Sequence, residues 1–584
     1  MKFAHLCLLF GVSVRNNKLR DEILPMETNR LHAFLKQHHL FCILVSASIF
    51  LFFFELGSRS FEIKDARRFA EITQEMIQGG SWLVLHKHGE IYMNKPPMLM
   101  WLIALFSSIG HQVTPLTARL PSAIAGFSSI LVIYYFTQKF YNQRAAFIAA
   151  IILATSHRYF WYGRSAFPDM LFTLFITLAL FSFYLGYKQN KEFYIGMHLS
   201  MFFATLTKGP LGIIFILSII VAFLAFQRNL KTFKELKWQW GSILIIIMVG
   251  ICIAYCLKVG FEPFITAIKR EFLTRVNKPV NNGEPFYYYF VNIWADFLPW
   301  SLFIPLAAIY AYKKWRLGDE YITFIFCWAI LVFTILCVAK AKHPRYMLPL
   351  YPALSILMAA LIEDTLKESV ILPSWLRSSV RWIIFTMIGL TAILLVIVPA
   401  YFFNYSWVGI FVSLIILLIA MKVFFFLRQK NGLVNMYFAM CMLITVIGWG
   451  IYVHCLTIHS RNETFGTKLT YAIEKDLGDL NTYHICGYEL GGSLWNIVNM
   501  SLNMYVPMIN SIQELKAFMN APDHKPLCIV EKKIFEKIKD YVLDDSLNTL
   551  SVCTTKRQVT LIFKRNNHTD SMRPVYFEIP DIKN

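Results

Sequence analysis

Residues 62–119 read EIKDARRFAEITQEMIQGGSWLVLHKHGEIYMNKPPMLMWLIALFSSIGHQVTPLTAR and directly follow the first long apolar run of the chain. This stretch holds a dense cluster of ionisable side chains, although a loop between membrane segments has no packing reason to carry them. The cluster consists of Asp65, Arg67, Arg68, Glu71, Glu75, Lys87, Glu90 and Lys95. Charges that stay beside a bilayer usually serve a site or a partner. We therefore expect a functional loop between two membrane spans.

The composition places the whole chain among membrane proteins. Of its 584 residues, 57% are hydrophobic and only 16% are charged, whereas soluble domains carry about 25% charged residues. Apolar runs of about 18 residues recur, which is typical of transmembrane helices. The net charge of +20 could suggest nucleic-acid binding. Lys and Arg gather in short loops between apolar runs, however, and this pattern indicates membrane topology rather than a nucleic-acid partner.

The apolar runs predict about thirteen spans by the hydropathy criterion. They lie at 39–54, 118–139, 144–157, 169–187, 194–207, 210–227, 240–258, 293–312, 321–339, 346–363, 381–402, 406–427 and 434–456. The run 97–110 is also apolar, but it is short and follows two prolines.

The distribution of basic residues decides how the run 97–110 is placed. If it lies along the outer interface as a helix, the basic loops after alternate spans all fall on one side, as the positive-inside rule requires. These loops contain Lys139/Arg144, Lys188/Lys191, Arg228/Lys231/Lys234/Lys237, Lys313/Lys314/Arg316, Lys367/Arg377/Arg381 and Arg428/Lys430. The first loop, 56–117, and the C-terminal segment are then outside.

The two ends of the chain differ from the membrane domain, which we place at 39–456. Residues 1–38 form an N-terminal cytoplasmic segment, in which a short apolar run resembles a signal-peptide core and Met26 is an alternative start. Residues 457–584 are polar and predict an outer α/β domain. Its expected helices are 467–477 and 511–520, its expected strands are 483–488, 527–530 and 559–564, and Cys486, Cys528 and Cys553 could form one disulfide.

Several basic residues fall on the outer side of the membrane, although Lys and Arg are usually more frequent in cytoplasmic loops. They are Arg67, Arg68, Lys87, Lys95, Arg158, Arg164, Lys208, Lys258, Lys269, Arg270, Arg275, Lys278, Lys340, Lys342 and Arg345. A solvated loop face explains any one of them, but an anionic ligand explains the set more economically. Phosphate is the natural candidate, because Arg and Lys bind it through charge-assisted hydrogen bonds.

Two carboxylates stand at the outer ends of predicted helices. Asp65 heads an amphipathic helix and Asp169 follows Pro168 at the start of a span, so either could be an N-terminal cap. Together they could flank one substrate or hold a divalent cation, which prefers oxygen ligands. Lys208 interrupts an apolar region, where it either faces a site or snorkels to the interface. His86 and His88 are a weaker metal pattern, more typical of solvated histidines.

A resemblance to a known family rests on an ordered set of motifs. They are Asp65–Glu71 (DARRFAE), Tyr92–Pro97 (YMNKPP), Thr117–Pro121 (TARLP), Gly163–Asp169 (GRSAFPD), Leu206–Pro210 (LTKGP) and Pro344–Pro352 (PRYMLPLYP). The set resembles the aminoarabinose (4-amino-4-deoxy-L-arabinose) lipid A transferase branch of the protein O-mannosyltransferase-like superfamily, over roughly residues 60–460.

The resemblance implies a GT-C fold in the bacterial inner membrane, with the active site and C-terminal domain in the periplasm. It also implies inverting transfer of a sugar from undecaprenyl phosphate to a lipid A phosphate. By this likeness Asp65 and Asp169 are catalytic, and Lys95 contacts the donor phosphate. The expected substrate-binding set is completed by Arg68, Tyr92, Arg164, Lys208, Arg345 and Tyr346.

Two departures from the family pattern bear on the chemistry. Ala66 follows Asp65 where the family often has Glu, and Asn94 stands where the aminoarabinose enzymes have Glu. A divalent metal ion held by Asp65 and Asn94 is a further expectation, although an amide is a weaker ligand than a carboxylate. Transfer to protein hydroxyls or another surface glycan remains an alternative, as does flipping of a lipid-linked sugar or a scaffolding role for the tail.

Overall fold

The computed structural model describes most of the membrane domain and much of the C-terminal domain. The described residues are 40–58, 64–87, 89–108, 110, 112–269, 284–367, 373–384, 386–387, 469, 473, 477, 483–490, 498, 502, 506–521, 525–542, 547–553, 558–564 and 575–577. The predicted N-terminal segment 1–38 and the spans 406–427 and 434–456 lie outside them, as does most of the span 381–402.

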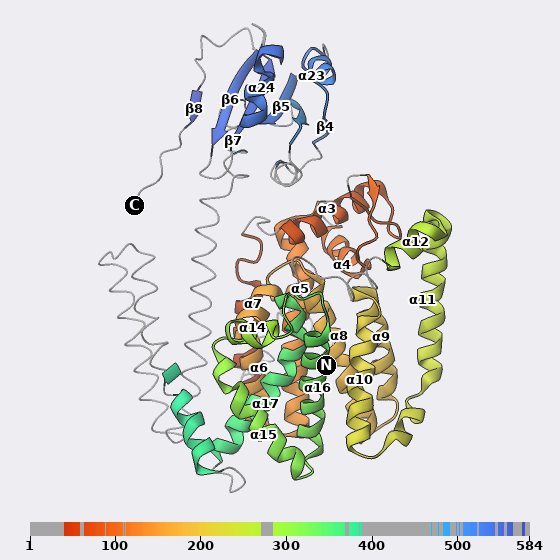
Figure 1. The fold of residues 1–584 in the computed structure, drawn as a ribbon, viewed down its shortest axis with the longest axis vertical. Helices are drawn as coiled ribbons and strands as arrows, with labels where there is room; N and C mark the ends of the chain where they lie inside the picture. The colour runs from red at the N-terminus through yellow and green to blue at the C-terminus, as the bar shows by residue number, and fades with distance from the viewer. Residues whose placement is uncertain are drawn as a thin grey trace, which may run out of the picture.

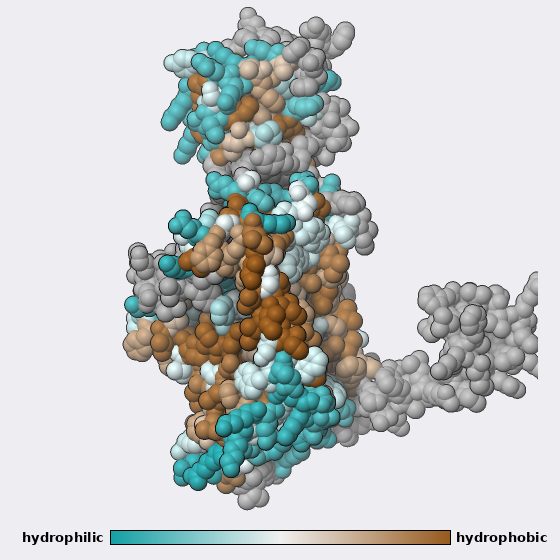
Figure 2. All heavy atoms as spheres, turned by 90° about the vertical axis from the view of Figure 1, so that its right-hand side faces the viewer, coloured by the Kyte–Doolittle hydropathy of each residue, from teal (hydrophilic) through white to brown (hydrophobic). Residues whose placement is uncertain are grey.

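The membrane domain is a bundle of long helices that lie side by side (Figure 1). Its principal helices are Leu40–Phe53, α5 (Pro115–Phe140), α6 (Gln143–Thr155), α8 (Pro168–Lys188), α9 (Phe193–Lys208), α10 (Leu211–Phe226), α11 (Trp238–Val259), α16 (Glu320–Val338) and α17 (Tyr351–Leu366). Each corresponds to a predicted span. An apolar band crosses the bundle between polar ends (Figure 2), as expected for a chain that spans a bilayer.

The predicted continuous span 293–312 is wrong. The chain there forms α14 (Tyr288–Asp296), the 3₁₀ turn η3 (Trp300–Phe303) and α15 (Ile304–Arg316). Pro299 explains the interruption, since it has no backbone N–H and restricts Leu298 to conformations that do not continue a helix. The predicted span 346–363 likewise begins as a 3₁₀ helix, η4 (Pro344–Leu350), before α17 follows.

The first loop caps one end of the bundle (Figure 1). It contains α3 (Lys64–Gly79), a hairpin of β1 (His86–Lys87) and β2 (Glu90–Ile91), and α4 (Met98–Ser107). The ten residues of α4 span about 15 Å, half of a bilayer core of about 30 Å. This length agrees with the prediction that residues 97–110 form a helix without crossing. Shorter elements join the long helices: α7 (His157–Gly163), η1 (Leu230–Glu235) and α12 (Phe261–Ile268).

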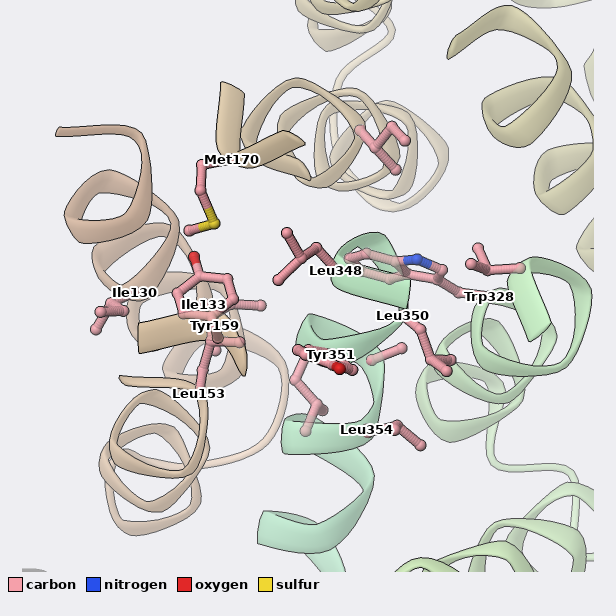
Figure 3. Close-up of a cluster of buried hydrophobic side chains, with 14 of the residues drawn as sticks. Ile130, Ile133, Leu153, Tyr159, Met170, Trp328, Leu348, Leu350, Tyr351 and Leu354 are labelled. Atoms are coloured by element: carbon pink, nitrogen blue, oxygen red, sulfur yellow. The ribbon is translucent and has the colours of Figure 1, made fainter. Parts of the chain in front are cut away.

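The core holds η4 in place between helices. Leu348 and Leu350 from η4 and Tyr351 from α17 face the same buried cluster as Met170 and Tyr159 (Figure 3). The indole N–H of Trp328 donates a 2.9 Å hydrogen bond to the carbonyl of Pro349. Burial of these side chains therefore fixes the segment that carries Arg345 and Tyr346.

The C-terminal domain is a mixed sheet of six strands in the order β4-β3-β5-β7-β6-β8. The strands are β3 (Tyr483–Tyr488), β4 (Met508–Ile509), β5 (Lys525–Glu531), β6 (Leu547–Cys553), β7 (Gln558–Lys564) and β8 (Val575–Phe577), with α23 (Ile512–Met519) and α24 (Lys532–Val542). The predicted α/β character is confirmed, and β4, β6, β8 and α24 are additional. Cys486 and Cys528 are register partners on β3 and β5, where they are free thiols.

Candidate functional site

Asp169 is the centre of a buried ionic cluster at the start of α8. Pro168 opens the helix, which places Asp169 in its first turn, where the helix dipole favours a carboxylate. The Nζ of Lys208 forms an ion pair with one carboxylate oxygen of Asp169. The Nε of Arg345 lies 3.8 Å from the other. Residues from α8, α9 and η4 thus converge, as the sequence motifs suggested.

Aromatic rings surround the two cations. The Nζ of Lys208 lies 4.9 Å from the ring centre of Phe172 and 5.0 Å from that of Tyr346. The guanidinium carbon of Arg345 lies 5.1 Å from the ring centre of Phe167. Such contacts stabilise a cation more strongly where water is scarce. They hold Lys208 and Arg345 in fixed positions beside one another.

The cluster is built to attract an anion. Among the side chains that the structure describes, it combines two cations with one carboxylate, and these three side chains are exposed unequally. The side chain of Asp169 is only 2% exposed, whereas those of Lys208 and Arg345 are 11% and 17% exposed. A ligand can therefore reach the cations but not the carboxylate that holds them. A phosphate suits this arrangement, because both cations can donate charge-assisted hydrogen bonds to it.

The first loop meets this cluster through aromatic contacts. Phe69 of α3 packs edge-on against Phe167, with 6.3 Å between ring centres. The guanidinium of Arg68 lies 5.2 Å from the ring of Phe69 and 6.0 Å from the ring of Tyr92. Arg68 and Tyr92 therefore belong to the same continuous surface as Phe167 and Arg345.

The structure locates the other predicted site residues of the first loop, which are Asp65, Asn94 and Lys95, on the backbone. Asp65 is the second residue of α3, and its side chain lies outside the described part. Asn94 and Lys95 are half-buried in the segment between β2 and α4. The backbone N–H of Tyr92 donates to the carbonyl of Leu85 at 2.8 Å, which fixes where this segment begins. The catalytic and phosphate-binding roles of Asp65 and Lys95 stay predictions.

Arg164 is held by the backbone of the first helix. Its guanidinium donates to the carbonyls of Leu51 at 2.7 Å and Phe54 at 2.6 Å. These carbonyls stand at the C-terminal end of the helix Leu40–Phe53, where they have no partner within the helix. Arg164 therefore caps this helix, and a contact with substrate remains a prediction. Lys342 has a similar position, since it donates to the carbonyls of Cys337 and Ala339 at the end of α16.

Sequence reasoning missed a second buried ion pair close to the cluster. Asp296 at the end of α14 is 1% exposed and accepts hydrogen bonds from the guanidinium of Arg158. Tyr162 interacts electrostatically with this pair and with Arg345 and Asp169. A carboxylate at a helix C-terminus is opposed by the dipole. An acidic residue inside a predicted span was the signal that could have drawn attention to it.

No metal-binding group is present among the side chains that the structure describes. In that part of the chain, no three His, Cys, Asp or Glu side chains lie close enough together to hold an ion. The side chains of Asp65 and His88 lie outside it. The prediction of a divalent ion is therefore untested.

Comparisons with known proteins agree with the resemblance. Residues 94–255 match the family model described as dolichyl-phosphate-mannose-protein mannosyltransferase. An uncharacterized protein of Aquifex aeolicus is 28% identical over 326 residues, 56% of this chain and 64% of that protein. The undecaprenyl phosphate-alpha-4-amino-4-deoxy-L-arabinose arabinosyl transferase of Aeromonas hydrophila is 29% identical over 340 residues, 55% of this chain and 59% of that protein. The match spans less than two thirds of the length of either relative.

The fold has a solved counterpart. The structure matches ArnT from Cupriavidus metallidurans, crystallised with undecaprenyl phosphate, with a TM-score of 0.72 and 17% sequence identity. The match covers 90% of this chain and 98% of that one. The predicted GT-C fold, with a helical membrane domain and a C-terminal sheet domain, is confirmed.

Proposed function

We propose that this protein is an inverting glycosyltransferase of the bacterial inner membrane. It would move aminoarabinose, or a related sugar, from undecaprenyl phosphate to a lipid A phosphate at the periplasmic face. The observation that carries the proposal is the cluster of Asp169, Lys208 and Arg345, whose cations are accessible while their counter-ion is buried. The similarity to a transferase named for undecaprenyl phosphate-linked aminoarabinose supports the choice of donor.

The cations supply what the chemical step needs. When the bond between the anomeric carbon and the phosphate oxygen breaks, its electron pair stays on the departing phosphate. Fixed positive charge stabilises that developing charge with little reorganisation. Lys208 and Arg345 are fixed by Asp169 and by the rings of Phe172, Tyr346 and Phe167. Lys95, from the first loop, would join them on the donor phosphate.

Asp65 would act on the acceptor. The acceptor oxygen attacks the anomeric carbon from the face opposite the leaving phosphate, so the configuration inverts. A hydroxyl acceptor gains from a general base, which Asp65 would provide. A lipid A phosphate is already anionic, so Asp65 would then orient it. Asp65 is the second residue of α3, and Phe69, one turn further on, packs against Phe167 beside the cluster.

A divalent ion is a further part of the proposal. The carboxylate of Asp65 and the amide of Asn94 would supply two oxygen ligands, fewer than the six or more that Mg²⁺ or Ca²⁺ takes. When bound, the ion would neutralise phosphate charge. Transfer activity that survives EDTA treatment, with the chelator then removed, would exclude it.

Transfer to protein hydroxyls is the second candidate function, because the matching family model is described as a protein mannosyltransferase. Mass spectrometry separates the acceptors. Lipid A from cells with the protein should carry a sugar-phosphate mass that is absent from cells lacking it. An unchanged lipid A together with a lost glycopeptide would favour protein as the acceptor. If both are unchanged, lipid A and protein are both wrong as acceptors, and another surface glycan becomes the candidate.

A further inference from the structure

The helix α14 holds the backbone from which Arg345 projects. Tyr289, in the first turn of α14, is fully buried, and its hydroxyl reaches the segment that leads into η4. The hydroxyl accepts a hydrogen bond from the backbone N–H of His343 at 3.1 Å. The same hydroxyl donates to the carbonyl of His343 at 3.3 Å. One side chain thus clamps both polar groups of a single peptide residue, two positions before Arg345.

His343 passes this constraint to Arg345. It is the N-cap of η4, and its ring nitrogen Nδ1 accepts a 3.4 Å hydrogen bond from the backbone N–H of Arg345. The carbonyl of His343 also accepts from the backbone N–H of Tyr346 at 3.0 Å. Both site residues of η4 are therefore oriented by His343, and His343 is oriented by Tyr289.

The other end of α14 is anchored independently. Asp296, the last residue of the helix, pairs with Arg158 of α7. The backbone N–H of His157 donates to the carbonyl of Leu298 at 2.9 Å, just beyond the helix. The helix that carries Tyr289 is thus held at its far end by contacts that do not involve His343.

We propose that Tyr289 is a positioning residue that acts on Arg345 through His343. It keeps Arg345 beside Asp169, where the guanidinium can contact a lipid-borne phosphate. The inference rests on the proposed function for the identity of that ligand. Without the hydroxyl, the backbone N–H of His343 loses the partner that fixes it, while its carbonyl keeps the hydrogen bond from Tyr346, and η4 shifts to satisfy the N–H. Arg345, on a long side chain at the start of η4, then samples more orientations.

A double-mutant cycle on purified protein tests the inference, with undecaprenyl phosphate as the probe. Tyr289→Phe should weaken binding by about tenfold, the effect of losing one or two buried hydrogen bonds. Arg345→Ala should weaken it by at least as much. Because Tyr289 acts through Arg345, adding Tyr289→Phe to Arg345→Ala should change the affinity by less than about twofold.

Tyr351→Phe is the matched control. Tyr351 is also fully buried and directly follows η4, but its hydroxyl has no hydrogen-bond partner among the described residues. The Tyr351→Phe variant should bind undecaprenyl phosphate as tightly as the unaltered protein does. Independent, multiplying effects of Tyr289→Phe and Arg345→Ala would overturn the positioning role, as would unchanged binding by Tyr289→Phe. Normal binding and coupling without any sugar transfer would overturn only the proposed function. Failure of the unaltered protein to bind would overturn both.

Discussion

The Nε of Arg345 lies 3.8 Å from Oδ2 of Asp169, and the ammonium of Lys208 forms an ion pair with Oδ1 of the same carboxylate. Three segments far apart in the chain therefore share one buried negative charge. Asp169 is thus placed as the counter-ion of two cations that an anionic ligand can reach. The predictions below separate the residues that bind the ligand from those that hold the fold.

Replacement of Asp169 by Asn should destabilise the protein markedly. The change removes the carboxylate that pairs with Lys208 and Arg345, and breaking a buried ion pair on one side costs about 3 kcal/mol. Thermal unfolding of the purified protein measures the loss. Combining Asp169→Asn with Lys208→Met also removes one of the two cations that paired with this carboxylate, and it should recover part of the stability. A single variant as stable as the unaltered protein would contradict the role of Asp169 as counter-ion.

Replacement of Arg164 by Gln should affect stability rather than ligand binding. Its two hydrogen bonds to the carbonyls of Leu51 and Phe54 cap the first helix. Because charged donors contribute about 1.5–3 kcal/mol each, we expect the loss of both hydrogen bonds to cost at least about 3 kcal/mol, with affinity for undecaprenyl phosphate within about twofold. Arg345→Ala provides the contrast, since it should weaken binding. A stable Arg164→Gln protein with tenfold weaker binding would instead place Arg164 in the binding site.

Glu71 should make stability depend on pH near neutrality. Burial raises the pKa of Glu71 from 4.5 to about 7, although Lys87 and Arg67 oppose the shift. The folded protein then retains a proton that the unfolded chain releases. The stabilisation is therefore complete below about pH 4.5 and is lost as the pH rises towards 7. Each pKa unit corresponds to about 1.4 kcal/mol, so the full change in stability is between about 3 and 4 kcal/mol.

The measurement for Glu71 is thermal unfolding between pH 4.5 and 8. Glu71→Gln, which cannot ionise, should flatten the profile over this window. Glu75→Gln is the control on the same helix, because Glu75 lies one turn away and accepts a hydrogen bond from the backbone N–H of Gly89 at 3.2 Å. If Glu71→Gln follows the same pH profile as the unaltered protein, another group is responsible.

Local sequence signals predicted most of the fold because membrane helices are specified by their own composition. The runs 118–139, 169–187 and 321–339 are apolar over most of their length and become α5, α8 and α16. In the predicted span 293–312 the apolar pattern continues on both sides of Pro299, so hydropathy alone does not reveal that the helix is interrupted there. Strands such as β6 were missed because the residues around 547–553 alternate weakly.

The candidate site was only partly predictable, since pairing between distant residues leaves no local trace. Basic charge on the outer side of the membrane identified Lys208 and Arg345 individually, and a carboxylate at the start of a predicted span identified Asp169. The same rule also selected Arg164 and Lys342, whose partners are helix-end carbonyls. Composition cannot separate a cation that caps a helix from one that awaits a ligand, because both occur at the ends of spans. Only the folded structure shows that Asp169 forms an ion pair with Lys208.

The most direct test of the account is the affinity of the purified protein for undecaprenyl phosphate, compared between the unaltered chain and Lys208→Met. Methionine keeps the length and apolar packing of the lysine stem but removes its charge. If the cluster binds the lipid-borne phosphate, the affinity should fall by at least about tenfold, a loss of about 1.4 kcal/mol. Equal affinities for a folded Lys208→Met protein would contradict the central claim.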